Sequence, residues 1–279
     1  MTVVDLLLVR HAESCGNIQK QTKLNDITHR IRQTGILHEP SLSIRGYIQS
    51  FYLRDYILSS KSNSITYDKV LCSPLIRTVV TAMIALSSFN NKENTNVIYI
   101  VPYVKFHTKK LSKINSVSEL KDKIHNFKLW FGQSGIHLYQ LYRETHFGTP
   151  NHHITSIHFP RIDYTALEDY ERMFRENEII HVTDEFHRYI SSSLSISSVL
   201  IFTHKRFIQH IAGIKHEPKN TSILKMTFDT EHPAHNVTQV YEPSKKINGV
   251  RITRKYQIEH CKSADSFQSK KNTRKKRVH

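Results

Sequence analysis

The feature that most constrains the fold is a set of short apolar runs, most of them followed at once by polar residues. The runs are Val3–Val9, Lys69–Cys72, Asn96–Val101 and Val199–Thr203. Each has the length of a strand and is apolar almost throughout, which is typical of strands buried on both faces of a mostly parallel sheet. Stretches with helical periodicity lie between them. The pattern predicts an α/β fold with three layers, in which helices flank a mostly parallel sheet.

The helical stretches and the remaining segments predict the domain organisation. We expect helices at Ser43–Ser59, Pro74–Ser88, Ser118–Phe131, Thr165–Arg175 and Thr183–Ser191. Residues 132–163 are rich in His, Gly and Pro, so we expect an irregular insertion there. The last residues lack apolar periodicity and, over 262–279, carry seven Lys or Arg against one Asp. We therefore predict one catalytic domain over residues 1–260 and a disordered basic tail over 261–279.

Composition narrows the class of protein. A chain of 279 residues, 38% of them hydrophobic, can bury the core of one large domain. Three cysteines without CxxC spacing argue against a disulfide framework or a zinc site, and so favour an intracellular, cytoplasmic protein. No apolar run reaches the ~20 residues of a membrane span, so no membrane partner is expected. The N-terminal run lacks the basic start and cleavage site of a signal peptide.

The charge suggests the kind of partner. The net charge is +16, and about two thirds of the excess lies outside the tail. A body this basic suits a phosphorylated small molecule or a phosphoprotein through long-range attraction, although simple solubility explains it equally well. The basic tail suggests weak nucleic-acid contact, or a nuclear location as the alternative to the cytoplasm. The oligomeric state has no sequence signal.

The first candidate for chemistry follows the N-terminal run, which ends directly before Arg10 and His11. The carboxyl ends of strands are where ligands bind in an open α/β sheet. A guanidinium fork there suits a phosphate, and a neutral imidazole nitrogen can attack phosphorus. Ser14 and Asn17 follow at helical spacing and could bind further phosphate oxygens.

Two other strand ends carry similar residues. Ser73 and Pro74, a good N-cap and a good first helical residue, follow the second run, and they predict a helix whose first turn contains Arg77. That turn favours an anion, because its backbone N–H groups lack partners. His204 follows the last run as His11 follows the first. Among 19 histidines chance placement matters, but these four cationic or hydrogen-bonding groups could surround one phosphoryl group.

The motifs resemble those of the histidine phosphatase (phosphoglycerate-mutase-like) superfamily, in family order. Residues 10–17 resemble its Arg-His-Gly-Glu-Ser-x-x-Asn motif, 42–49 its Leu-Thr-x-x-Gly-x-x-Gln helix start, 72–82 its Ser-x-Leu-x-Arg-x-x-x-Thr-Ala block and 202–204 its late Ser/Thr-His. The resemblance implies a phosphoglycerate-mutase-like fold without a metal or cofactor. It also implies that His11 becomes phosphorylated in a pocket formed by Arg10, Arg77 and His204, with Ser14 and Asn17 in support.

The chain departs from the family pattern at three places. Ala12 replaces the usual glycine, and Lys205 follows the late histidine where glycine is common. The third run leads into residues 102–107 without the carboxylate that serves the family as general acid. His107 is the candidate substitute, and Glu93 and Glu119 are poorer ones by position.

Three functions remain open on this basis. The leading one is a phosphatase that hydrolyses phosphomonoesters through a phosphohistidine on His11, slowly if the general acid is missing. A phosphoglycerate mutase fits less well, because the resemblance covers only the phosphate pocket. The third is a non-catalytic phosphate- or partner-binding module that kept the pocket.

Overall fold

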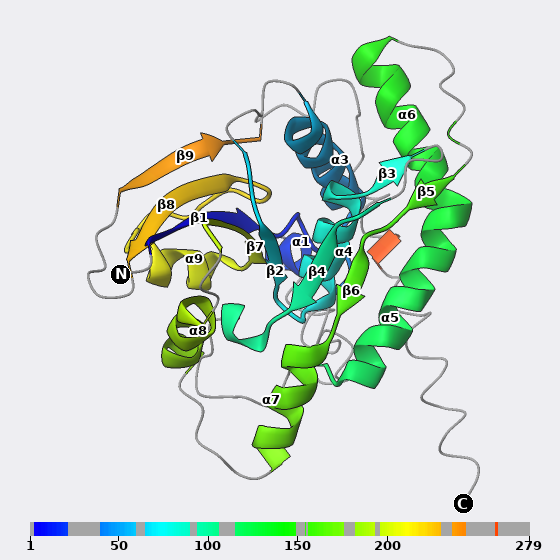
Figure 1. Ribbon diagram of the computed structural model, residues 1–279. Helices are drawn as coiled ribbons and strands as arrows, with labels where there is room; N and C mark the ends of the chain where they lie inside the picture. The colour runs from blue at the N-terminus through cyan, green and yellow to red at the C-terminus, as the bar shows by residue number, and fades with distance from the viewer. Residues whose placement is uncertain are drawn as a thin grey trace, which may run out of the picture.

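The computed structural model describes residues 3–21, 40–59, 65–89, 94–105, 115–148, 154, 156–175, 182–192, 196–229, 236–243 and 260–261. Its centre is a seven-stranded sheet with the order β6-β4-β2-β7-β1-β8-β9 (Figure 1). The strands are β1 (Val3–Arg10), β2 (Lys69–Cys72), β4 (Val97–Ile100), β6 (Arg161–Asp163), β7 (Ser198–Thr203), β8 (Ile223–Asp229) and β9 (Val237–Tyr241). A separate two-stranded sheet pairs β3 (Ser88–Phe89) with β5 (Ile157–His158).

The helices connect these strands or follow them. They are α1 (Cys15–Gln21), α3 (Ile44–Leu58), α4 (Ile76–Ala85), η2 (Pro102–Val104), α5 (Val117–Trp130), η3 (Phe131–Gly135), α6 (Ile136–Phe147), α7 (Thr165–Arg175), α8 (Val182–Ser191) and α9 (Lys205–Ile211). Of these, η2 is a 3-10 helix and η3 a turn of π-helix.

The sheet is mostly parallel, as the apolar runs predicted. Strands β1, β7, β2, β4 and β6 run parallel, while β8 and β9 extend the sheet in antiparallel fashion beyond β1. The register places Arg10 beside Thr203, and Cys72 beside Phe202. The carboxyl ends of β1, β7 and β2 therefore lie together although they are far apart in the sequence.

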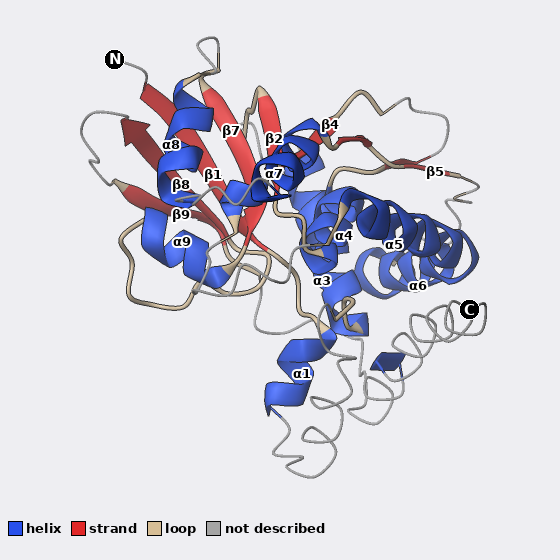
Figure 2. Ribbon diagram, turned by 90° about the horizontal axis from the view of Figure 1, so that it is seen from below, coloured by secondary structure: helices blue, strands red, loops and turns tan. Residues whose placement is uncertain are grey.

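Helices cover both faces of the sheet, which confirms the three-layer α/β architecture. Helices α3, α4, α5 and α6 lie on one side, and α7, α8 and α9 on the other (Figure 2). Two separate apolar clusters match these layers. One contains Phe51, Val79 and Phe131, and the other contains Phe186, Phe207 and Tyr170.

The prediction of an irregular insertion at residues 132–163 is wrong for most of its length. Helix α5 continues through the π-turn η3 into α6, and β5 and β6 follow. Aromatic packing stabilises this arrangement, because Phe131, Tyr139 and Tyr142 all contact the ring of Phe51 on α3. The helix ends at Gly148, whose φ of 60° is the left-handed conformation that glycine adopts without strain.

Local capping explains where the helices begin. Ser43 caps α3 by accepting a hydrogen bond from the Gly46 N–H, and Ser116 forms a capping box with Glu119 at α5. Helix α4 begins at Ile76 without a side-chain cap, two residues later than predicted. Ser73 is therefore no N-cap, and its hydroxyl contacts His204 instead.

The prediction that the cysteines form no disulfide is also wrong. Cys15 on α1 is bonded to Cys261, 246 residues away in the sequence. Cys72 is buried as a free thiol, as expected, and burial raises its pKa. The compartment predicted from reduced cysteines loses that support. Of the predicted tail, only Cys261 is among the described residues, and 262–279 lie outside them.

Candidate active site

The structure brings together the four residues that the motifs single out. Arg10 ends β1 and His11 follows it, His204 follows β7, and Arg77 is the second residue of α4, which begins shortly after β2. The rings of His11 and His204 lie 5.1 Å apart. We call Arg10, His11, Arg77 and His204 the strand-end cluster. The parallel register of β2, β7 and β1 is what assembles it.

Hydrogen bonds fix the tautomer of His11. Its Nδ1 lies 2.7 Å from the Ala12 carbonyl oxygen, which can only accept, so Nδ1 carries the hydrogen. Its Nε2 lies 3.3 Å from the Arg77 Nε–H, which donates to it. His11 is buried, with 6% of its surface exposed. The lone pair of Nε2 is thus directed toward the cationic side of the cluster.

Arg77 and the segment after His11 are coupled through Thr81. The Thr81 hydroxyl donates to the Arg77 carbonyl oxygen at 2.7 Å and accepts from the Ala12 N–H at 3.1 Å. The first turn of α4 is therefore held against the residue that orients His11. This explains why an Arg and a Thr four residues apart occur together in the motif, because on a helix they share one face.

His204 is held in place by two hydroxyl groups. Its Nε2 lies 2.8 Å from the Ser73 hydroxyl and 3.3 Å from that of Thr78. Burial, and then the positive charges of Arg77, Lys105 and Arg10, hold the pKa of His204 well below its usual value. His204 is thus neutral near pH 7. Its Nδ1 is buried and has no hydrogen-bond partner in the described part of the chain.

Arg10 is buried, with 8% of its side chain exposed. Its NH1 donates to the Pro218 carbonyl and lies 2.9 Å from a carboxylate oxygen of Glu217. Burial lowers the pKa of Arg10, which Glu217 partly offsets. Its Nε lacks a partner among the residues that the structure describes. Buried donors are rarely left unpaired, so an unpaired nitrogen on Arg10 and another on His204 are consistent with a ligand site.

A loop after α9 fixes the backbone of the cluster. The Asn220 side chain donates to the His11 carbonyl at 2.7 Å, and the Thr221 N–H donates to the Arg10 carbonyl at 2.9 Å. Thr221 has a φ of 60°, a conformation that side chains with a branched Cβ rarely adopt. The strain at Thr221 is offset by these backbone bonds.

Ser14 and Asn17 lie beside the cluster but bond to each other. The Ser14 hydroxyl and the Ser14 N–H both donate to the Asn17 side-chain oxygen, at 2.8 and 2.9 Å. In this state the Ser14 hydroxyl hydrogen is committed to the Asn17 side chain. The close approach of α3 to the segment after His11 requires a glycine at position 46, because a Cβ there would lie 2.0 Å from the Glu13 carbonyl oxygen.

Sequence reasoning missed several residues of the site. Lys105 acts electrostatically on His204, Glu217 contacts Arg10 and Lys205, and Asn220 holds His11. A strand-end position could have indicated Lys105, since it follows β4 closely, but no pattern marks Glu217 or Asn220. Among the candidate acids, His107 and Glu93 lie outside the described residues, while Glu119 belongs to the capping box of α5.

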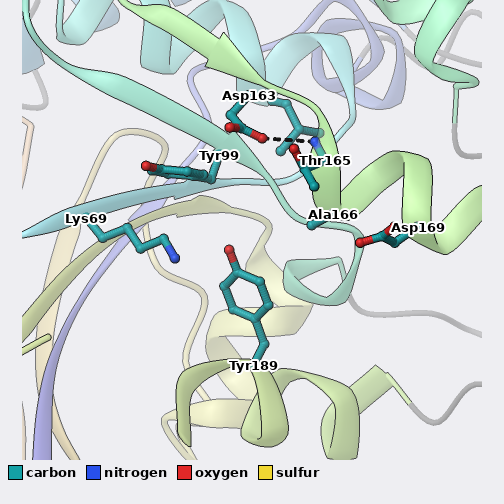
Figure 3. Close-up of a pocket in the computed structure, with 8 residues that line it drawn as sticks. Lys69, Tyr99, Asp163, Thr165, Ala166, Asp169 and Tyr189 are labelled. Carbon is teal, nitrogen blue, oxygen red and sulfur yellow. Dashed lines mark hydrogen bonds between the residues drawn. The ribbon is translucent and has the colours of Figure 1, made fainter. Parts of the chain in front are cut away.

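A separate hollow lies between the sheet and helices α7 and α8 (Figure 3). It has a volume of about 290 Å³ and is lined by Lys69, Tyr99, Asp163, Asp169 and Tyr189 among others. The Lys69 ammonium lies over the rings of Tyr99 and Tyr189, 4.7 and 4.9 Å from their centroids. None of the residues that line this hollow belongs to the strand-end cluster.

The described residues lack two kinds of feature, a metal-binding group and a membrane-spanning helix. They contain no group of three or more His, Cys, Asp or Glu that could hold a metal ion. They also contain no helix with the length and apolar character needed to cross a membrane.

No family model and no curated protein sequence matches the chain. Solved structures with a similar fold include an alpha-ribazole phosphatase from Shigella flexneri, with 15% identity, 89% of this chain and 100% of that chain covered, and a TM-score of 0.42. Others are a phosphoserine phosphatase from Entamoeba histolytica (16%, 87% and 98%, 0.38) and the protein histidine phosphatase SixA (12%, 85% and 95%, 0.35). Similarities this distant assign no activity to this chain, so the function is argued from the geometry.

Proposed function

We propose that the chain is a phosphomonoesterase in which His11 is the nucleophile and carries the phosphoryl group as a phosphohistidine. The observation that carries the proposal is the fixed tautomer of His11. Its Nδ1–H is bound to the Ala12 carbonyl, which leaves the Nε2 lone pair facing the Arg77 guanidinium. A neutral imidazole held in this way, beside cations that bind phosphate oxygens, has the arrangement needed for attack on phosphorus.

The first step would form a bond between His11 Nε2 and phosphorus while the bond to the leaving oxygen breaks. The electron pair departs with that oxygen, which then takes up a proton. The imidazole ring becomes positively charged, and the Ala12 carbonyl that accepts its Nδ1–H stabilises this charge. Arg10, Arg77 and His204 would bind the equatorial oxygens of the phosphoryl group, where charge develops.

In the second step, water attacks phosphorus and the electron pair of the P–N bond returns to His11 Nε2. Inorganic phosphate leaves, and the proton of the attacking water passes to solvent. The substrate on this proposal is a phosphorylated small molecule or a phosphoprotein. Neither step requires a metal or an organic cofactor in its atom and electron balance.

A non-catalytic phosphate-binding module is the second candidate, and one observation favours it. Glu217 is a carboxylate that contacts the strand-end cluster. It is paired with Lys205 and Arg10, and these cations lower its pKa. An acid that stays ionised donates no proton to a leaving group. Without a donor elsewhere, the cluster would bind phosphate and turn it over slowly or not at all.

Turnover of an aryl phosphate by the wild type and His11→Ala tests the proposal, with the exposed His216→Ala as the matched control. We expect His11→Ala to lose at least about 10³-fold in kcat, since the covalent route requires the nucleophile. The wild type should also trap a phosphoryl group on His11, detected by mass spectrometry after rapid quench. Phosphate binding without turnover or a trapped phosphoryl group would support the binding module instead.

A further inference from the structure

Glu217 places a carboxylate on the guanidinium that the proposed function assigns to phosphate. One of its oxygens lies 2.9 Å from Arg10 NH1, and the other contacts the Lys205 ammonium. The two ends of the first pair differ in exposure. The Arg10 side chain is 8% exposed, while that of Glu217 is 51% exposed. The cation is thus enclosed by the protein, and its anion lies at the surface.

Carboxylate and phosphoryl oxygens compete for the same donors. A guanidinium binds either anion through its N–H groups, and both form short charge-assisted bonds. On Arg10, NH1 serves both the Pro218 carbonyl and Glu217. The Arg10 Nε, unpaired among the described residues, remains open to a phosphoryl dianion, but a dianion bound there lies against the Glu217 carboxylate as a like charge, which favours its displacement.

We infer that Glu217 is the resident anion of the strand-end cluster, a positioning residue that neutralises Arg10 until a phosphoryl group displaces it. This inference rests on the proposed function only in assuming that the cluster binds phosphate. After displacement, Glu217 stays paired with Lys205, the first residue of α9. The phosphate then compensates the positive charge of Arg10 in place of Glu217.

The surrounding backbone allows this exchange without a change of fold. The loop that carries Glu217 is held by the Thr221 N–H on the Arg10 carbonyl and by the Asn220 side chain on the His11 carbonyl. Pro218 still accepts from Arg10 when the carboxylate leaves. Rotation of one exposed side chain therefore suffices, and the guanidinium keeps its position.

The state of Glu217 fits this role better than that of a proton donor. The hydrogen bond from Lys205 is the largest influence on the pKa of Glu217 and lowers it; burial opposes this effect, and the charges of Arg10 and Lys205 lower the pKa further, so that it lies below its usual value. The carboxylate is therefore ionised throughout the neutral pH range. An ionised carboxylate serves as a counterion, whereas a general acid must hold a proton at the working pH.

Competition between the Glu217 carboxylate and phosphate for Arg10 lowers the apparent affinity for phosphate by an amount that can be calculated. If the Glu217–Arg10 pair is closed in most molecules, the apparent affinity for phosphate equals the intrinsic affinity multiplied by the fraction of molecules in which the pair is open. A pair closed about 90% of the time lowers the apparent affinity about tenfold. Glu217→Gln removes the charge, so it should lower the KM for substrate and the Kd for inorganic phosphate by the same factor, about three- to tenfold.

The test is isothermal titration of inorganic phosphate into the wild type, Glu217→Gln and Glu242→Gln, followed by steady-state kinetics. Glu242→Gln is the matched control. It removes the same charge, but from a carboxylate that pairs with Lys219 at the surface. Tighter phosphate binding in Glu217→Gln alone supports the inference. Equal tightening in both variants would show a general charge effect and overturn it, as would unchanged or weaker binding in Glu217→Gln.

Kinetics separate the inference from its alternatives. A fall in kcat that is greater for alkyl than for aryl phosphates, without tighter phosphate binding, would make Glu217 the proton donor and overturn the inference. Phosphate titration needs no turnover, so it also works if the protein is not a phosphatase. Failure of the proposed function would appear as a wild type that binds phosphate but never hydrolyses an ester.

Discussion

The two ends of strand β2 carry polar groups of different kinds. Lys69, at its beginning, faces the hollow of Figure 3, and Ser73, just past its end, contacts His204 in the strand-end cluster. At the first end the ammonium lies over two tyrosine rings; burial lowers the pKa of Lys69, and the nearby Asp163 partly offsets this effect. At the second end, the buried Arg10 and the partly buried Arg77 and Lys105 lie close enough to lower the pKa of His204, and one nitrogen each of Arg10 and His204 lacks a partner among the described residues.

This difference supports the proposal that the strand-end cluster, and not the hollow, is the ligand site. Aromatic faces and acidic side chains compensate Lys69 within the protein, so the hollow is electrostatically complete without an occupant. In the strand-end cluster, Arg10 and Arg77 lie close to a neutral His204, and Lys105 lies nearby. Glu217 offsets part of the positive charge of these three cations. An unbalanced, buried charge marks a binding site better than the volume of an opening does.

Removal of Arg77 should produce the largest difference between the two ends. We expect Arg77→Ala to lower kcat/KM for an aryl phosphate by a factor that corresponds to about 2–4 kcal/mol of lost transition-state stabilisation. This is the scale of one charge-assisted contact made in the transition state. Arg172→Ala is the control, since this exposed arginine pairs with Asp169 at the hollow. Equal losses in both variants would remove the distinction between the two regions.

The pH dependence of stability should depend on His204. Its pKa is lowered in the folded protein, so between that value and the unfolded pKa of ~6.5 the unfolded chain binds more protons. Stability is therefore retained above pH ~6.5 and lost as the pH falls below it, by up to ~1.4 kcal/mol per pH unit for one proton.

Denaturant unfolding between pH 7.5 and 5.5 measures this slope. His187 and His260, whose pKa values burial also lowers, contribute to the wild-type slope. His204→Asn should make the slope shallower, while the exposed His216→Asn should leave it unchanged. An identical slope in His204→Asn and the wild type would mean that His204 carries a proton in the folded state.

Ser73 gives a smaller effect. Ser73→Ala removes the hydroxyl 2.8 Å from His204 Nε2, while the Thr78 hydroxyl remains at 3.3 Å. We expect a loss of about 0.5–1.5 kcal/mol in kcat/KM, the usual net contribution of one hydrogen bond. Ser192→Ala, on the exposed end of α8, is the control. Wild-type kcat/KM in Ser73→Ala would show that Thr78 alone positions the ring.

The smallest effect on activity is expected at the beginning of β2. Lys69→Met keeps the aliphatic stem but removes the ammonium from the rings of Tyr99 and Tyr189, so stability should fall by about 0.5–2 kcal/mol. We expect kcat/KM to stay within about twofold of the wild type. A loss in kcat/KM greater than tenfold would show that the hollow is coupled to the strand-end cluster.

The strands that assemble the cluster could be predicted because their signals are local. Apolar runs of four to seven residues indicated β1, β2, β4 and β7, and their parallel pairing places the residues after them at one edge. Residues 132–147 were not predicted as helix, since Gly132 and Gly135 each lower helix propensity by ~1 kcal/mol. The contacts of Phe131, Tyr139 and Tyr142 with Phe51 compensate, and these are tertiary.

Long-range pairs explain the other errors. Cys15 and Cys261 are 246 residues apart, and no spacing rule joins cysteines at that distance. Ser73 has the sequence features of an N-cap, but His204 offers its hydroxyl a partner from another strand. Glu217 lies in a segment without periodicity, so its contact with Arg10 follows only from the path of the folded chain.

The position of β1 has a consequence for synthesis of the chain. β1 is made first, yet it lies between β7 and β8, which are made nearly last, and Asp5 pairs with Ser198 (Figure 1). At about 5–20 residues per second, the ribosome needs roughly 10–40 s to supply these partners. Throughout that interval the leucines of β1 have no neighbours in the sheet. The apolar segment that leads into His11 therefore stays unpaired during most of the synthesis of the domain.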